Sequence, residues 1–397
     1  MNAASGPRTL AIRIAAAVAG FCTFINLYSP QAILPLLSQE FGAGAKEISA
    51  IITASTLAVA LIAPFSGTVA DVLGRKRVIV TAMVVLAIPT VMSALASSLD
   101  SLILWRFVQG LAMPPVFAVT VAYIGEELSP KEATAVTGFY TSGSSLGGFT
   151  GRLLTGALAD AVNWRFALCV LAAMTVVGAV IVAKLLPPER NFVKSSGLVA
   201  SGRQMLGHFR NPQLLATFAV GFGVLFNFLA AFTFISFRLA APPYNLSPTL
   251  LGIIFVTYLS GTALTPMTGR FVGRFGRRGF VLLAIGIWVA GIALTLVQPL
   301  WLILVGLSIS ACCGMLCQAV STGYVAITAQ VGRSSAVGLY VTSFYLGGSF
   351  GAGIGGVAWT VGGWPACVAM IAIMLAIMAA IVAVTWRTPQ PQPQPQA

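Results

Sequence analysis

Long apolar stretches separated by short polar segments constrain this chain more than any other feature. A helix needs about 20 residues to cross roughly 30 Å of hydrocarbon, and twelve stretches of the sequence reach that length. Only 8% of the residues are charged, so water is not the main solvent of the chain. The sequence therefore predicts an all-α membrane protein with twelve transmembrane helices. The predicted spans are residues 12–37, 48–70, 78–97, 101–123, 133–157, 165–186, 213–237, 249–268, 279–298, 301–325, 334–358 and 364–386.

The basic residues are distributed unevenly around these spans. If the N-terminus is inside, seventeen Lys and Arg lie on the cytoplasmic side and three, Lys46, Arg165 and Arg238, lie at or near the opposite side. Positive charge next to a span resists translocation. The pattern predicts a multi-pass protein of a bacterial-type inner (plasma) membrane with both termini cytoplasmic. It also explains the net charge of +13 by topology, without nucleic acid as a partner.

A repeated segment divides the chain into two related halves. GTVADVLGRKRV at residues 67–78 and GRFVGRFGRRGF at residues 269–280 each join one predicted span to the next. At an offset of 200, five glycines of span five align with glycines of span eleven. Parallel repeats of this kind suit a carrier whose halves rock about a midplane site. We predict pseudo-symmetric six-helix halves at residues 1–186 and 212–387, a cytoplasmic linker at 187–211 and a disordered Pro/Gln tail at 388–397.

The first copy of the repeat also carries a known motif, and here the chain resembles the major facilitator superfamily of transporters. Over nearly its whole length it is similar to the twelve-span drug and sugar efflux branch. Its segment FYTSGSSLGGFTGRLLTG is most similar to the YnfM-type inner-membrane carriers. The resemblance implies the major facilitator fold and a loop motif that holds the cytoplasmic side closed when the carrier opens outward. The residues that match this motif are Gly67, Asp71, Gly74, Arg75, Lys76 and Arg77.

Elementary electrostatics agrees with a contact role for Asp71. A carboxylate at a helix end beside a cationic loop can make charge-assisted contacts worth about 1 kcal/mol when exposed. The alternative is a cationic loop that only sets topology, especially for Arg77.

Arg106, Gln109 and Gly110 in span four match a second motif of the superfamily. A cation inside a span costs several kcal/mol unless it faces a partner or water, so it is a functional candidate. The resemblance implies a role in proton coupling or substrate binding. Arg106 lies close to the outer end of its span, so the alternative is that its side chain snorkels to the interface.

A glycine-rich motif of antiporters is only partly kept in span five. Gly148 stands where the motif has Pro, and Arg152 replaces its last Gly, which weakens the inference of antiport. Arg152 is a second cation inside the membrane, and it can face the cavity, pair with Asp160 or reach the outer interface. Recurring small residues let helices approach closely. The candidate packing glycines are Gly110, Gly143, Gly147, Gly148, Gly151, Gly347, Gly348 and Gly351.

All nine acidic residues fall in loops or at the ends of spans. A cavity with two cations, aromatic rings and uncharged polar groups favours neutral or anionic solutes over cations. We expect no cofactor and no metal site, because no His, Asp or Glu lies inside a span. Besides Arg106, Gln109 and Arg152, the candidate substrate and proton-coupling residues are Asn26, Tyr28, Gln31, Asn227 and Gln318. Hydrogen bonds between helices are the alternative role of the four amides.

The sequence favours a monomeric secondary active transporter that exports a small organic solute by alternating access. The proton gradient is the expected energy source, because no GxxxxGK[ST] loop for a nucleotide occurs. Coupling could run through Asp71, Asp160 or Arg106. Alternatives are a facilitative carrier, a multidrug exporter without charge preference, and a sensor or lipid flippase on the same fold. A channel fits the repeat less well, and an intramembrane enzyme lacks the necessary residues.

Overall fold

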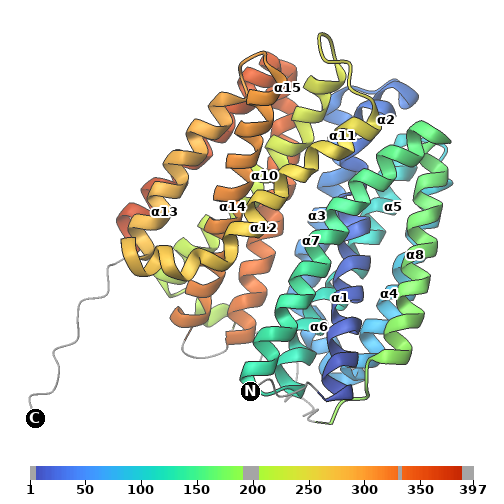
Figure 1. Ribbon diagram of the computed structural model, residues 1–397, viewed down its shortest axis with the longest axis vertical. Helices are drawn as coiled ribbons and strands as arrows, with labels where there is room; N and C mark the ends of the chain where they lie inside the picture. Colours follow the sequence, from blue (N-terminus) through green and yellow to red (C-terminus); the bar gives the residue numbers. More distant parts are fainter. Residues whose placement is uncertain (1–5, 191–204, 330–332, 387–397) are drawn as a thin grey trace, which may run out of the picture.

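The computed structural model describes residues 6–190, 205–329 and 333–386, and all regular structure in these ranges is helical. The prediction of an all-α fold is confirmed for them. Figure 1 shows two groups of long, roughly parallel helices, α1 to α8 and α10 to α15. The first group contains α1 (Pro7–Leu27), η1 (Ser29–Ala32), α2 (Leu34–Phe41), α3 (Ala45–Leu73), α4 (Arg75–Ala94), α5 (Leu99–Ala112), α6 (Pro114–Glu127), α7 (Pro130–Ala161) and α8 (Trp164–Leu185). The second contains α10 (Pro212–Ala240), α11 (Pro248–Ile254), η2 (Phe255–Thr257), α12 (Tyr258–Leu264), η3 (Thr265–Met267), α13 (Thr268–Leu294), α14 (Leu300–Thr328) and α15 (Arg333–Thr385).

Nine helical segments in the described ranges are long and apolar enough to cross a membrane. Two of them, Pro248–Leu294 and Ser335–Thr385, have 47 and 51 residues, more than twice what one crossing needs. The backbone is not helical at Gly276 in the first and at Gly362 and Gly363 in the second. These breaks fall between the predicted spans eight and nine, and eleven and twelve. The exact number of crossings stays a prediction.

Predicted spans one and four are each interrupted, and predicted span eight alternates short α and 3-10 segments from α11 to η3. Span one is interrupted after Leu27, where the 3-10 helix η1 precedes α2. Span four is divided at Met113 into α5 and α6. Each of the breaks in spans one and four precedes a proline, Pro30 or Pro114, which lacks the N–H that would continue the helical hydrogen bonds. Most of the predicted linker, residues 191–204, and the predicted tail, residues 388–397, lie outside the described residues, so the domain boundaries stay a prediction.

Glycines lie where helices of one half approach each other most closely. Gly143 and Gly147 of α7 face the backbone of α1 at Ala17 and Phe21, and Gly151 faces Ile25 in the same way. In the second half, Gly347 and Gly351 of α15 face the backbone of α10 at Phe222 and Phe226. Gly110 faces the backbone of Ser55, and Gly348 faces the Leu225 side chain. Gly148 has only the Arg152 side chain nearby.

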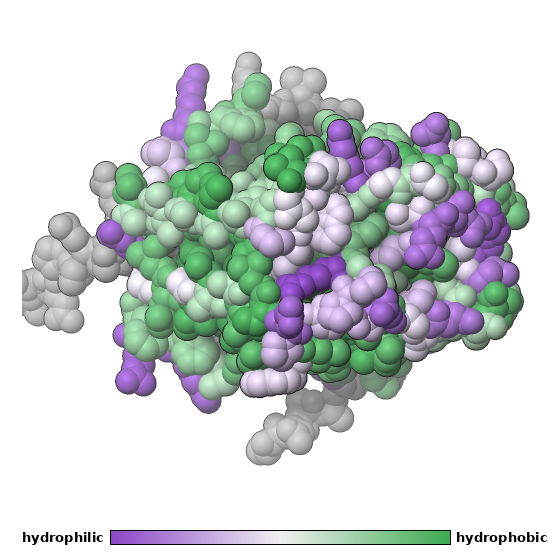
Figure 2. Space-filling model, turned by 90° about the horizontal axis from the view of Figure 1, so that it is seen from above, coloured by the Kyte–Doolittle hydropathy of each residue, from purple (hydrophilic) through white to green (hydrophobic). Residues whose placement is uncertain are grey.

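The two halves contact each other along α3 and α15 and between α7 and α11. The Thr56 and Ser349 hydroxyls lie 2.9 Å apart, and Gly338 of α15 faces Pro64 of α3. We call the end with α2 and the loop at residues 241–247 the far end, and the end where α1 begins and α8 ends the linker end. At the far end, Gly156 of α7 meets the backbone of Pro248, and Asp160 accepts a 2.8 Å hydrogen bond from the Thr249 N–H. Seen from the far end, polar residues gather over the centre and over the half formed by α1 to α8 (Figure 2). These contacts between α7 and α11 join the halves beside the buried cations described next.

Candidate functional site

Arg106 of α5 binds the carbonyl groups at the end of α1. Pro30 has no N–H for the Asn26 carbonyl, so α1 ends with carbonyls that lack helical donors. The Arg106 NH1 nitrogen donates to the Asn26 carbonyl at 3.0 Å, and NH2 donates to the Leu27 carbonyl at 2.6 Å. The C-terminus of a helix also attracts a cation. Arg106 is 1% exposed, so the snorkelling alternative is wrong.

Gln109 extends this contact into a buried network across α1, α4, α5 and α8. Its amide nitrogen donates to the Thr90 hydroxyl at 2.6 Å, and its amide oxygen accepts a hydrogen bond from Arg106. Asn26 accepts from the Thr90 hydroxyl at 3.1 Å and donates to the Thr175 hydroxyl at 2.8 Å. In the described ranges no carboxylate pairs with Arg106. Uncharged groups and the helix end therefore stabilise the guanidinium.

Arg152 of α7 lies between the two halves and is 3% exposed. Its Nε donates to the Gln31 amide oxygen at 2.8 Å, and NH1 donates to the Gly148 carbonyl at 2.7 Å. The rings of Tyr28, Phe255 and Tyr258 have their centroids 4.7, 4.3 and 5.0 Å from the guanidinium carbon. Cation–π contacts of this kind are worth about 2 kcal/mol when desolvated. We call Arg152, Gln31 and these three rings the Arg152 cluster.

The Arg152 cluster joins elements of both halves. Phe255 and Tyr258 belong to the second half, and the Gln31 amide nitrogen donates to the Thr233 hydroxyl of α10 at 3.2 Å. Asp160 binds Thr249 and not Arg152, so that pairing alternative is wrong, and so is the outer interface, because the side chain is buried. The described residues give Arg152 no carboxylate and give its NH2 nitrogen no hydrogen-bond acceptor. The cluster can therefore bind an anion or a polar neutral group.

The two remaining candidates lie apart from both arginines. Asn227 is fully buried and donates to the Met378 sulfur at 3.4 Å, while its amide oxygen has no partner in the described ranges. Gln318 is half-buried in α14. Within the described residues, neither side chain is hydrogen-bonded to Arg106 or to the Arg152 cluster. The structure thus groups Asn26 with Arg106 and Gln109, and groups Tyr28 and Gln31 with Arg152.

Sequence reasoning missed several members of these groups. Thr90 and Thr175 are ordinary hydroxyl residues of apolar helices, and nothing local distinguishes them. Nothing in the sequence around Phe255 marks it as a site residue either. Tyr258 could have been chosen on the ground that selected Tyr28, because both are polar aromatic residues within predicted spans.

The loop motif makes ion pairs at the linker end. Arg75 pairs with Asp71 at 2.7 Å, and its Nε donates to Glu126 of α6 at 2.8 Å. Gly74, at φ 91°, separates α3 from α4 with a backbone that L side chains rarely adopt. Lys76 is half-buried and Arg77 is exposed. The remaining motif residue, Gly67, lies within α3 with open space around it. Sequence reasoning missed Glu126.

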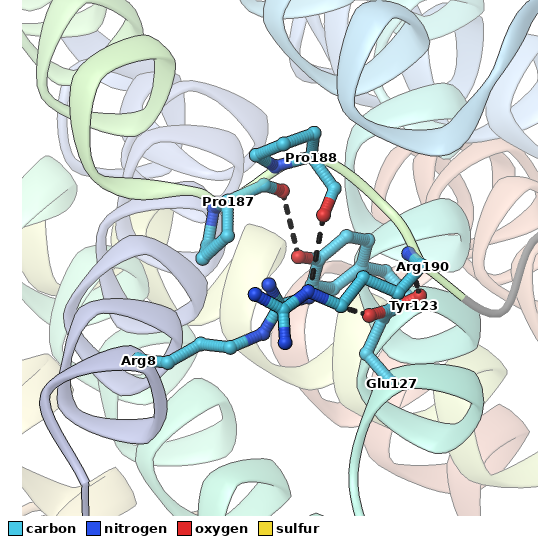
Figure 3. A network of polar contacts seen from close by, with 6 residues as sticks. All are labelled: Arg8, Tyr123, Glu127, Pro187, Pro188 and Arg190. Carbon is cyan, nitrogen blue, oxygen red and sulfur yellow. Dashed lines mark hydrogen bonds and ion pairs between the residues drawn. The ribbon is translucent and has the colours of Figure 1, made fainter.

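A second network beside this loop fixes the start of the predicted linker to the first half (Figure 3). Arg8 pairs with Glu127 at 2.7 Å and donates to the Pro188 carbonyl at 3.2 Å. The Tyr123 hydroxyl donates to the Pro187 carbonyl at 2.7 Å. The Arg190 N–H donates to Glu127 at 2.7 Å, so the chain that leaves α8 is attached to α1 and α6 as far as Arg190.

Comparisons with known proteins agree with the fold and identify the family. The family model described as Major Facilitator Superfamily matches residues 16–240 and 220–397. The inner membrane transport protein YnfM of Escherichia coli (strain K12) is 34% identical over 93% of this chain and 89% of that protein. The uncharacterized MFS-type transporter YybF of Bacillus subtilis (strain 168) is 29% identical over 90% of this chain and 86% of that protein.

Two solved structures share the fold at low sequence identity. A mutant form of the nucleoside transporter NupG superimposes with a TM-score of 0.76 at 16% identity and covers 95% of this chain and 100% of its own. A bacterial homologue of the human lysosomal transporter Spinster, in an inward-facing and occupied conformation, gives 0.75 at 16% identity over 97% of this chain and 98% of its own. The resemblances read from the sequence are confirmed.

Proposed function

Because the chain belongs to the Major Facilitator Superfamily of membrane transporters, we propose that it exports a small neutral or anionic organic solute by alternating access. It is a multi-pass inner-membrane protein, and we propose that both termini are cytoplasmic and that a monomer is the working unit. We further propose the proton gradient as the energy source.

The Arg152 cluster carries the proposal on the substrate. A guanidinium buried between the halves without a carboxylate repels cations and attracts anionic or electron-rich groups. Its NH2 nitrogen has no acceptor in the described part of the chain and is available to a ligand. Tyr28 and Tyr258 are half-buried, and their rings lie against the same guanidinium.

The contacts between the halves support alternating access. Gln31 accepts from Arg152 in the first half and donates to Thr233 in the second, so a solute that displaces Gln31 from Arg152 disturbs the side chain that joins the halves. Asp160 binds Thr249 across the same boundary. We propose Asp160 as a coupling residue, because protonation removes the negative charge that strengthens this hydrogen bond.

Uptake into everted membrane vesicles tests the proposal. Cationic, neutral and anionic compounds are compared with and without a pH gradient. We expect anionic or neutral compounds to be transported, and Arg152→Gln to lower that transport at least tenfold while Arg152→Lys keeps part of it. Arg165→Gln, a change at a half-buried arginine of the same half that lies outside the Arg152 cluster, is the matched control and leaves transport unchanged.

Each opposite result overturns a separate part of the proposal. Preferential transport of cations would refute the charge argument. Normal transport by Arg152→Gln would remove Arg152 from the site. Transport that ignores the pH gradient would identify a facilitative carrier instead of a proton-coupled exporter.

A further inference from the structure

The two copies of the repeated loop differ in charge at matching positions. Gly67 and Gly74 of the first copy correspond to Gly269 and Gly276 of the second. On that alignment Gly273 stands at the position of Asp71, so the second copy has lost the acid. Arg270 stands at the position of Thr68, and Arg274 at that of Val72. The second copy therefore carries four arginines, Arg270, Arg274, Arg277 and Arg278, and no carboxylate.

The structure shows what this difference does to the cations. In the first copy Arg75 is buried and pairs with both Asp71 and Glu126. Its counterpart Arg277 has no ion pair in the described residues, and its guanidinium carbon lies 4.7 Å from the centroid of the Tyr324 ring. The other three arginines of the second copy are exposed. No Asp or Glu occurs anywhere in residues 190–397, so the second half supplies no acidic side chain to them.

Topology alone does not explain the missing acid. The orientation of a membrane protein depends on its Lys and Arg, and Asp and Glu contribute little. The first copy keeps three cations together with Asp71, which shows that the acid is compatible with a basic loop. Four arginines without a carboxylate instead form a strong site for an anion from outside the chain.

Apolar side chains next to the arginines indicate the kind of anion. Phe275, between Arg274 and the break at Gly276, is 47% exposed. Leu283 and Ile287 follow on the next helical segment, are exposed to a similar degree and lie four residues apart, hence on one face. That segment lies within a candidate membrane span, so its exposed apolar face meets lipid. The four arginines thus immediately precede an exposed apolar strip of a membrane-spanning segment.

We propose that this loop binds the headgroup of an anionic phospholipid, phosphatidylglycerol or cardiolipin, whose acyl chains lie along Leu283 and Ile287. Guanidinium groups bind phosphate oxygens in bidentate fashion. Basic clusters at the membrane boundary bind anionic headgroups for the same reason. A free phosphate compound would use the arginines but leave the apolar strip uncovered. The proposed lipid therefore binds the second half, where the loop has four arginines and no carboxylate.

Restoring the acid of the first copy tests this proposal. A side chain at Gly273 meets no atom within 4 Å, so Gly273→Asp fits, and it can pair with Arg277 as Asp71 pairs with Arg75. We expect it to weaken binding of phosphatidylglycerol to the purified full-length protein about fivefold, the effect of removing one cation near a membrane surface. Native mass spectrometry with phosphatidylglycerol and with phosphatidylcholine measures the two affinities. Gly273→Ala is the matched control and keeps wild-type binding.

A second variant and a competitor complete the test. The triple change Arg270→Gln, Arg274→Gln and Arg278→Gln should abolish the preference for phosphatidylglycerol, whereas Lys76→Gln with Arg77→Gln in the first copy should leave it intact. Equal binding of the two lipids by the wild type, or unchanged binding by Gly273→Asp, overturns the proposal. So does full competition by glycerol phosphate at the lipid's own concentration, which would identify a site for a soluble phosphate.

Discussion

Asn26 and Asn227, which match between the halves at an offset of 201 residues, have very different surroundings. Asn26 in α1 donates to Thr175 and accepts from Thr90, so both ends of its amide are bound. Asn227 in α10 donates only to the sulfur of Met378, and its oxygen has no partner within the described ranges. The same residue is thus part of a polar network in one half and nearly isolated in the other.

Aromatic rings take the place of the network in the second half. Phe228, next to Asn227, has the rings of Tyr258 and Trp288 at 5.5 and 5.7 Å between centroids. The backbone contacts are nevertheless alike, because Gly147 faces α1 as Gly347 faces α10. The comparison teaches that the halves share their close helix contacts and differ in interior chemistry, because the buried arginines of the described residues all lie in the first half.

The largest expected effect is at Arg106. Arg106→Ala leaves the Asn26 and Leu27 carbonyls without their buried donor, and we expect a loss of about 3 kcal/mol of stability. Thermal unfolding of the purified protein in detergent, followed by fluorescence, measures this loss. An unchanged melting temperature together with lost transport would instead assign Arg106 to substrate or proton chemistry.

Adding a methyl group at the glycine contacts should lower stability by a similar amount in both halves. Gly147→Ala and Gly347→Ala each place a methyl group against the backbone of the neighbouring helix, so we expect about 1–3 kcal/mol of destabilisation from each. Gly138→Ala, at a helical position with no atom within 4 Å of the new group, is the control. If only one of the paired variants is destabilised, the halves do not share their close packing.

Replacing the two asparagines with leucine should have opposite effects on stability. Asn26→Leu removes a partner from Thr90 and Thr175 and should cost about 1–2 kcal/mol. Asn227→Leu removes a buried oxygen without a described partner, so it should be neutral or slightly stabilising. Melting temperatures of the two variants, measured side by side, give the answer. A strongly destabilised Asn227→Leu would show a hidden polar partner in the second half.

The smallest expected effect is on pH dependence, at carboxylates that only the first half has. A hydrogen bond from Arg165 lowers the pKa of Glu40, and one from the Ser129 hydroxyl lowers the pKa of Glu132. A carboxylate with a lowered pKa stabilises the folded state at pH values above the ordinary carboxyl pKa. This stability is lost as the pH falls through the lowered pKa. Melting temperatures between pH 7 and about pH 3 should fall slightly less for Glu40→Gln with Glu132→Gln than for the wild type. An equal fall in both proteins would contradict this account.

The sequence predicted the elements of this molecule better than the contacts between them. The length of the apolar stretches predicted the helices, and the cost of burying a cation selected Arg106 and Arg152 as candidate site residues from the sequence alone. The family motif selected Gln109 together with Arg106, and the structure shows the two side chains hydrogen-bonded to each other. The partners Thr90 and Phe255 come from helices distant in sequence, and their residue types carry no signal. The break after Leu27 is explained by Pro30, which is visible in the sequence. The separation of Arg152 from Asp160 is not, because it depends on how α7 contacts α11.

Gln31 has a consequence for how easily the halves can part. Its amide oxygen binds the first half and its amide nitrogen binds the second, and an amide does not ionise. Opening at that point exchanges one neutral hydrogen bond, worth about 1 kcal/mol, for a bond to water. A carboxylate there would accept a charge-assisted hydrogen bond from the Thr233 hydroxyl, which is stronger than a neutral one and would make separation slower. A neutral side chain at this junction suits a joint that has to open and close in every transport cycle.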